Sequence, residues 1–405
     1  MAELHNDFRD IFRVGRYGFS GKKISLHFLG LVLAYLIYEI LVYLSLLIAG
    51  GTAARDFWDK YGLMPALPTA NGDFETITIA AMGIGTLVLF LLFFSMNTMV
   101  SKITMQQLRG DHFFSMGESI GFAKKNWKVV FGTFIGLIVI FVLCAVAPIV
   151  VGLLGRIPVV GNIIVMLASI LTPFAFILGL LMAYLVVVFG VSLFLVPSVV
   201  AAANSDTFET VYQHFSIIWN QPWRLVVYEV LLFGVKVICS AIWAFFCLAG
   251  FVIAMLPVRL LIPTDMKMIM GQADKWLGNL IGKLAELPYI ETVKVFHLAE
   301  PANLPIVLKI ASVFMALSLL GIMGLIIAYL LSIASAGNTL IYTMLRRRVD
   351  GEDLLDVEEE QVDTSTPPET PSQTESQPEE AQPESDEISE EQSGSEESTN
   401  NDATE

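Results

Sequence analysis

Charged side chains inside long apolar runs are the residues best placed to do chemistry in this sequence. Glu39, Glu229 and Lys236 each lie in such a run. A lone ion in hydrocarbon is costly and faces a partner or a wet cavity. Glu39 follows His27 by 12 residues, and Lys236 follows Arg224 by 12, so parallel helices would place both groups about 18 Å along their axes. Equal depth predicts an intramembrane pair of Glu39 and Lys236, which Glu229 could extend.

Two interpretations of these charges stay open. The pair could orient helices during assembly, or the three groups could line a path for a proton or a solute. A closed, tightly packed bundle would favour the first interpretation. A cavity between the first and fifth spans would favour the second.

No other constellation of reactive side chains is visible. The histidines lack metal-ligand spacing, and the cysteines (Cys144, Cys239 and Cys247) lie in apolar runs where they resemble buried core residues. Phosphate-binding loops, nucleophile elbows and dinucleotide fingerprints are missing from the sequence. We therefore expect no catalytic residue, no metal and no cofactor, and interpret the chain as non-enzymatic.

The composition excludes a soluble globular protein. Hydrophobic residues make up 55% of the 405 residues, charged residues 16%, and the mean hydropathy is +0.66. Residues 350–405 hold 21 of the 39 acidic side chains and no Lys or Arg, so 18 acidic side chains face 24 basic ones in residues 1–349. The sequence therefore predicts a basic transmembrane domain, 1–349, and an acidic tail, 350–405.

The tail has no aromatic and few aliphatic residues, so it cannot offset the entropy of ordering and is predicted to be disordered. Its removal after Arg348 is expected to take away no core surface. An acidic, disordered segment suits binding to a cytoplasmic protein partner.

The transmembrane domain is predicted to be all-α, with about six transmembrane helices and interfacial amphipathic helices. A span needs about 20 apolar residues. Such runs occur near residues 27–49, 76–100, 129–153, 173–197, 225–257 and 305–345. The uncharged stretch from Arg156 to Asp206 is too long for one crossing, so 157–172 is expected to be a short non-spanning or partly inserted segment.

Basic residues in the connecting loops predict the orientation of the spans. Five Lys or Arg precede the first span, two lie in 50–75, five in 101–128, one in 154–172, and Arg346–Arg348 end the last span. Because cytoplasmic loops are enriched in Lys and Arg, both termini are expected in the cytoplasm. The absence of N-glycosylation sequons suits a bacterial inner membrane, and no nucleic-acid partner is expected.

Amphipathic helices are predicted before several spans. In 206–220, Asp206 and Glu209 have the spacing of a capping box, apolar residues form one stripe, and polar residues face the other way. A similar stretch occupies 115–128. Such helices should lie flat in the headgroup region. The residues expected to anchor them are Trp127, Lys128, Trp219, Trp223 and Arg224. Since spans begin near 27, 129 and 225, a threefold repeat of interfacial helix, outward span and inward span is inferred.

Residues 110–240 resemble a known group of membrane domains. The features that carry the resemblance are Pro197, the small residues after it, the acidic-capped helix and the re-entry "NQPWRLVV". With these features the chain is similar to six-helix bacterial integral-membrane domains of unknown function, related to a domain fused to some glycerophosphodiester phosphodiesterases. The resemblance implies fold and membrane location, and no hydrolase domain is present here.

Two functions remain open at this stage. The first is a non-enzymatic membrane scaffold or accessory protein whose acidic tail binds a partner. The alternative is a transporter or channel with a midplane polar site between the first and fifth spans.

Overall fold

The computed structural model describes residues 5, 7–66, 74–278, 304–351 and 354–355, and every regular element in these ranges is a helix. Most of the predicted tail lies outside the described residues. Six of the helices are long and apolar enough to cross a membrane, which confirms the predicted fold class. They are α2 (Gly21–Ala49), α4 (Thr76–Arg109), α5 (Met116–Leu154), α7 (Thr172–Ala203), α9 (Pro222–Leu261) and α13 (Ile306–Asp350).

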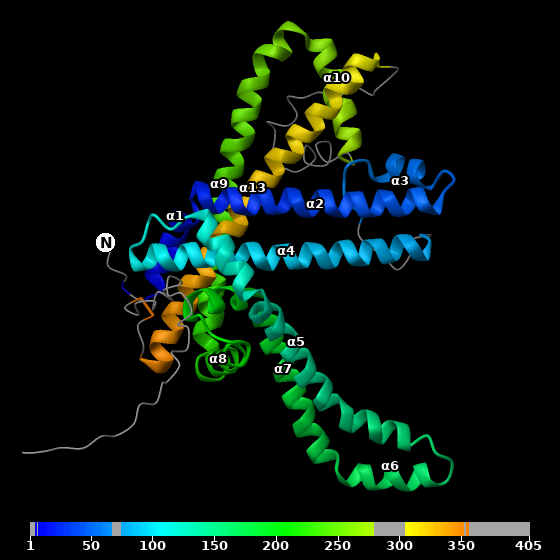
Figure 1. Ribbon diagram of the computed structural model, residues 1–405, viewed down its shortest axis with the longest axis vertical. Coiled ribbons are helices and arrows are strands. Elements are labelled where there is room, and N and C mark those ends of the chain that lie inside the picture. Colours follow the sequence, from blue (N-terminus) through cyan, green and yellow to red (C-terminus); the bar gives the residue numbers. More distant parts are fainter. Residues whose placement is uncertain (1–4, 6, 67–73, 279–303, 352–353, 356–405) are drawn as a thin grey trace, which may run out of the picture. The chain divides into compact units, whose positions relative to one another are not determined.

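Consecutive spanning helices pack in pairs, as Figure 1 shows: α2 with α4, α5 with α7, and α9 with α13. A short helix lies in the connection of each pair: α3 (Ala53–Tyr61), α6 (Val160–Ile170) and α10 (Pro263–Trp276). Before the first and third pairs lie further short helices, which are η1 (Phe8–Arg13) with α1 (Val14–Gly18), and α8 (Thr207–Asn220). The first and third pairs follow the order that a threefold repeat would produce, whereas the second pair has no separate short helix before α5.

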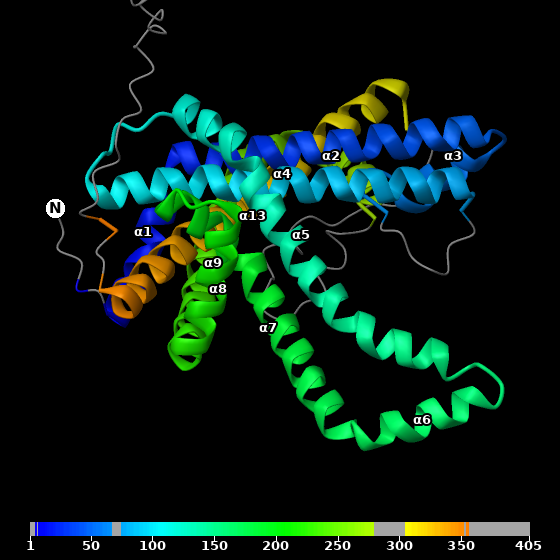
Figure 2. The same cartoon turned by 60° about the horizontal axis from the view of Figure 1, so that its bottom comes forward.

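Helix α13 lies where the three pairs meet (Figures 1 and 2). It packs on α2, α4, α7 and α9. Its residues Ile333, Leu340 and Tyr342 belong to the largest buried cluster, together with Leu232 of α9. A Cβ atom added to Gly337 would overlap the Leu232 side chain, so this glycine favours the close approach of α9 and α13.

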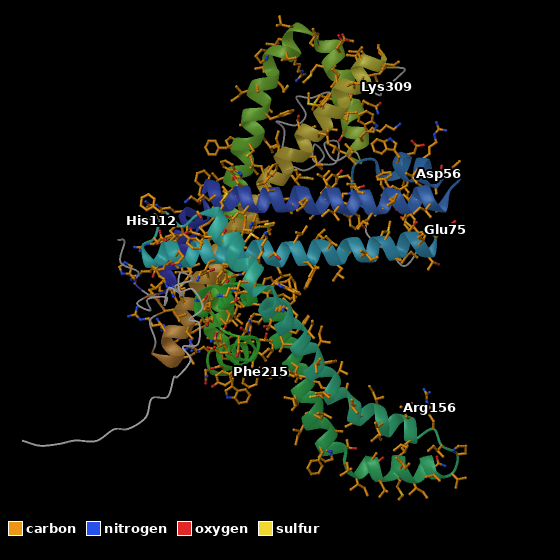
Figure 3. All side chains as sticks on the ribbon, viewed as in Figure 1. Asp56, Glu75, His112, Arg156, Phe215 and Lys309 are labelled. Atoms are coloured by element: carbon orange, nitrogen blue, oxygen red, sulfur yellow. The ribbon has the colours of Figure 1, made fainter. Side chains whose placement is uncertain are left out.

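The remaining faces of the spanning helices are apolar and exposed. In the most apolar 18-residue window of α9, 0% of the residues are buried inside the protein, and in that of α5 the share is 6%. Exposed apolar surface on this scale is stable only where hydrocarbon replaces water. Figure 3 agrees with this, because its labelled charged residues Asp56, Glu75 and Arg156 all lie near the ends of helices, and the lengths between carry mostly carbon.

Several helices are longer than the predicted spans. The stretch 115–128 is no separate amphipathic helix, because α5 starts at Met116 and runs on without a break. Ser115 and Glu118 form the reciprocal capping box there. Helix α7 likewise continues through Pro197 to Ala203, since the residues around Pro197 are buried and packing outweighs the one lost backbone bond. A helix-breaking residue such as Pro197 thus ends a helix only where the packing of the surrounding residues does not favour its continuation.

The stretch 157–172 contains α6, a separate apolar helix. Its 11 residues extend about 16 Å and cannot cross a bilayer core of about 30 Å. The turn before it holds Val159 at a φ of 71°. The described structure thus has a short helix where the sequence predicted a non-spanning segment.

Candidate functional site

The structure does not bring Glu39 and Lys236 together. Neither residue has an ion pair within the described part of the chain, and Glu39 Oε1 is buried without a hydrogen-bond partner. Helix α2 packs on α3, α4 and α13, whereas α9 packs on α13, α10, α8, α1 and η1. The equal depth of Glu39 and Lys236 along their helices was therefore not enough to predict a contact. Which side chains meet also depends on which helices are neighbours. Glu229 and Lys236 both lie on α9, seven residues apart, and form no ion pair with each other.

Tyrosine side chains occupy the stretch of α2 around Glu39. The hydroxyl of Tyr35 donates to the Leu63 carbonyl oxygen at 2.7 Å, and that of Tyr38 donates to the Ala66 carbonyl oxygen. These bonds tie the middle of α2 to the segment that follows α3. The hydrogen bonds next to Glu39 are thus those of Tyr35 and Tyr38 to backbone carbonyl oxygens, and the predicted pair of Glu39 with Lys236 is not formed.

The five predicted interfacial anchors all lie on the outside of the protein. Trp219 and Trp223 are 76% and 77% exposed, Trp127 is about half exposed, and Lys128 and Arg224 are exposed. Large aromatic side chains that point outward are suited to a membrane interface. Trp219 and Trp223 lie near helix ends, whereas Trp127 lies within α5.

Helix α8 buries part of its polar face against the protein. Thr210, Gln213 and His214 are 0% exposed, whereas Phe208 is 81% exposed. Its neighbours are α5, α7, α13 and α9, and Figure 3 labels Phe215 on it. Thr210, Gln213 and His214 thus contact the protein rather than water, whereas Phe208, Tyr212 and Trp219 face outward. Asp206 caps the helix by accepting from the Glu209 N–H, as predicted.

Hydrogen bonds explain why this polar face is buried. Gln213 Oε1 accepts from the Tyr342 hydroxyl of α13, and Gln213 Nε2 donates to Glu209 at 2.7 Å. His214 Nδ1–H donates to the Thr210 carbonyl oxygen at 2.6 Å. Burial lowers the pKa of His214 to about 4, although this backbone bond opposes the shift. The imidazole is therefore neutral at physiological pH.

A set of buried polar side chains, here called the polar seam, connects four spanning helices. Its members are His27 of α2, Asn97 and Ser101 of α4, Ser198 of α7, and Ser335, Asn338 and Thr339 of α13. None is more than 9% exposed. Ser335 Oγ is its centre, lying 2.6 Å from Asn97 Oδ1 and 3.3 Å from His27 Nε2.

A second group of seam bonds joins α7 to its neighbours. Ser198 Oγ lies 3.4 Å from Ser101 Oγ and accepts from Thr339 Oγ1 at 3.3 Å. Asn338 Nδ2 donates to the Phe194 carbonyl oxygen of α7 at 3.0 Å. Through these contacts the seam links side chains of α4, α7 and α13 in one hydrogen-bonded network, which specifies how the helices pack.

Two buried lysines lie near the seam. Lys23 Nζ donates to the Tyr17 carbonyl oxygen at 2.9 Å and to Gln107 Oε1 at 2.8 Å. Lys102 Nζ lies 4.4 Å from the ring centroid of Phe122 and 3.4 Å from Asn204 Oδ1. These ammonium groups hold α2 to α4 and α4 to the end of α7.

An apolar groove of about 580 Å³ lies beside the polar seam. It is lined by residues between 27 and 38 of α2, between 89 and 96 of α4, and between 317 and 331 of α13, and by Met64 and Pro65. His27 belongs to both the groove and the seam. A volume of this size is typical of a ligand pocket, and an apolar lining selects hydrocarbon over a polar solute.

The sequence interpretation missed the seam for an identifiable reason. Asn97, Ser101 and Ser335 are uncharged, so they do not interrupt a search for Asp, Glu, Lys and Arg in apolar runs. The run "SAGNTLIYT" from Ser335 to Thr343 was the available signal, because small and polar residues inside a spanning helix mark helix–helix contacts.

Taken together, six long apolar helices, lipid-compatible outer faces and a buried polar seam define a multi-pass integral membrane protein. No family model, no curated protein and no solved structure matches the chain. Within the described ranges, no group of three or more His, Cys, Asp or Glu side chains could hold a metal ion.

Proposed function

We propose that this protein is a non-enzymatic scaffold or accessory protein of the membrane, rather than a transporter or channel. The observation that carries the proposal is the burial of the polar seam between packed helices. Its side chains bond to one another between helices and are almost fully buried. A path for a polar solute needs polar groups that face a wet cavity, whereas the groove described above is apolar and lies between the first, second and sixth spans.

We also propose that the protein lies in a bacterial inner membrane and binds a cytoplasmic protein. Basic residues at the start of α2, around the α4–α5 connection and at the end of α13 favour cytoplasmic termini in a bacterial inner membrane. The acidic tail is the element suited to a cytoplasmic protein partner. The resemblance of residues 110–240 to six-helix bacterial membrane domains supports the same location.

Cysteine accessibility in cells tests the proposal. In a background without the native cysteines, Ser198→Cys places a thiol in the seam, and Gly121→Cys places one on an exposed position with open space around it. A small hydrophilic methanethiosulfonate should modify Gly121→Cys in inverted membrane vesicles and leave Ser198→Cys unmodified. Modification of Ser198→Cys would reject the scaffold proposal, because water would then reach the seam during a transport cycle.

A further inference from the structure

The apolar groove opens sideways, toward whatever surrounds the helices. Val32 and Leu36 of α2, Leu89 of α4, and Leu317 and Ile327 of α13 line it, and each is also more than a third exposed on the outside of the protein. These residues lie within helices that cross the membrane. The medium at the mouth of the groove is therefore hydrocarbon, and the occupant it supplies is a lipid chain.

Among the residues that the structure describes, no side chain fills this space. A Cβ atom added to Gly321, which lines the groove, would meet no heavy atom within 4 Å. Interiors are close-packed, and a groove of about 580 Å³ is far larger than an ordinary packing void. A hydrocarbon chain in it would gain the dispersion contacts that the lining side chains otherwise lack.

His27, which lines the groove, holds a hydrogen-bond acceptor that has no donor among the described residues. Asn97 Nδ2 donates to the Phe93 carbonyl oxygen, so Asn97 Oδ1 is the acceptor for the Ser335 hydroxyl. The single hydrogen of that hydroxyl is used in the bond to Asn97 Oδ1. Ser335 Oγ is therefore the acceptor in its contact with His27, and His27 Nε2–H is the donor. The neutral ring then has a bare Nδ1, and this buried atom has no partner in the described structure.

We propose that the groove binds the hydrocarbon chain of a lipid that carries a hydroxyl group, with the hydroxyl donating to His27 Nδ1. The chain then runs along α2 and α13 toward Tyr35 and Tyr38. The hydroxyls of both tyrosines already donate to backbone carbonyls, so that end offers the ligand apolar ring surface. The lipid fills the space beside Gly321 and satisfies the acceptor on His27.

The test uses the full-length protein in detergent and a photoreactive probe, oleyl alcohol with a mid-chain diazirine. Labelling should map to peptides of α2, α4 and α13 that line the groove. Unlabelled oleyl alcohol should compete about fivefold better than methyl oleate, which has no donor, a factor that corresponds to about 1 kcal/mol for one hydrogen bond. Equal competition by both compounds, or labelling spread evenly over all exposed helix faces, would overturn the proposal.

Two variants distinguish binding of the hydrocarbon chain from binding of the lipid hydroxyl group. Gly321→Leu should abolish labelling of the groove, because its side chain enters the open space without a clash. Gly250→Leu in α9 is its matched control, since Gly250 also has no neighbour within 4 Å and lies outside the groove, and it should label as the wild type does. His27→Leu should keep labelling but lose the preference for oleyl alcohol. Undiminished labelling of Gly321→Leu, or an unchanged preference in a folded His27→Leu protein, would count against the assignment.

This inference is independent of the scaffold proposal. Lipid in the groove is compatible with either function, and a hydrophilic reagent that reached Ser198→Cys would leave the competition result unaffected.

Discussion

At the scale of single residues, the polar seam depends on Ser335. Its hydroxyl contacts Asn97 and His27 at once, and all three side chains are buried. Replacing one partner of a buried hydrogen bond strands the others and costs more than the bond itself contributes. Loss of a single hydroxyl group from the seam should therefore clearly lower the free energy of unfolding.

Ser335→Ala is expected to lower the free energy of unfolding by about 1–3 kcal/mol, since it leaves Asn97 Oδ1 and His27 Nε2 without a partner. Thermal unfolding in detergent is the measurement. Ser318→Ala is the control on the same helix, because Ser318 is exposed and bonds only to the Phe314 carbonyl oxygen of its own turn. Equal effects of the two substitutions would mean that the seam adds no stability.

His214 should make the protein less stable in mild acid. Burial lowers its folded-state pKa to about 4, and the ordinary value is 6.5. Below pH 6.5 the unfolded state binds a proton that the folded state refuses, so stability is complete above pH 6.5 and declines toward pH 4. The decline from this group should approach about 1.4 kcal/mol per pH unit. Midpoints of thermal unfolding for wild type and His214→Gln should converge as the pH falls, and parallel curves would contradict this.

At the scale of elements, the first residues of the acidic tail are part of the folded protein. Leu354 is 7% exposed and packs in the main cluster with Leu355. Nε and Nη2 of Arg109, at the end of α4, donate to the Leu354 carbonyl oxygen at 3.1 and 3.0 Å. The expectation that removal of the tail after Arg348 takes away no core surface is therefore wrong.

Two truncations follow from these contacts. A chain that ends after Val357 keeps both leucines and should unfold at the wild-type temperature. A chain that ends after Arg348 should be less stable by roughly 2–4 kcal/mol, as burial of two leucine side chains and the Arg109 contact are lost. Thermal unfolding of the purified proteins compares them. If both truncated chains unfolded alike, the Leu354 contact would carry no stability.

Helix α8 shows why the sequence predicts elements better than their faces. The 3.6-residue period correctly indicated a capped amphipathic helix between α7 and α9. Period alone does not say which stripe meets the protein, because in a membrane the apolar stripe can face lipid while the polar stripe bonds to Tyr342. The same limit applies to Glu39 and Lys236, whose depth could be read from spacing but whose neighbours could not.

At the scale of the whole membrane domain, composition predicted the class of protein and the six spans. Apolar runs of about 20 residues are a strong signal, since hydrocarbon leaves the backbone few alternatives to a helix. The seam and the groove needed the three-dimensional arrangement, because their residues come from α2, α4, α7 and α13, far apart in sequence.

The predicted orientation can be checked with two exposed positions on different sides of the domain. Lys60→Cys on α3 should react with an impermeant maleimide in intact spheroplasts, whereas Gly121→Cys at the start of α5 should react only after lysis. The reason is the excess of Lys and Arg around Gly121. The reverse pattern would invert the domain and place both termini outside.

The length of α13 lets one helix connect two parts of the domain. Its 45 residues form one helix of about 67 Å, more than twice the thickness of a bilayer core. Near one end it packs on α10, and its other end leads directly into Leu354, held by Arg109. Because the helix is continuous, one hydrogen-bonded element connects the α10 end of the domain with the root of the acidic tail. Substitutions at the α10 contact and at the Arg109 contact therefore act on the same helix.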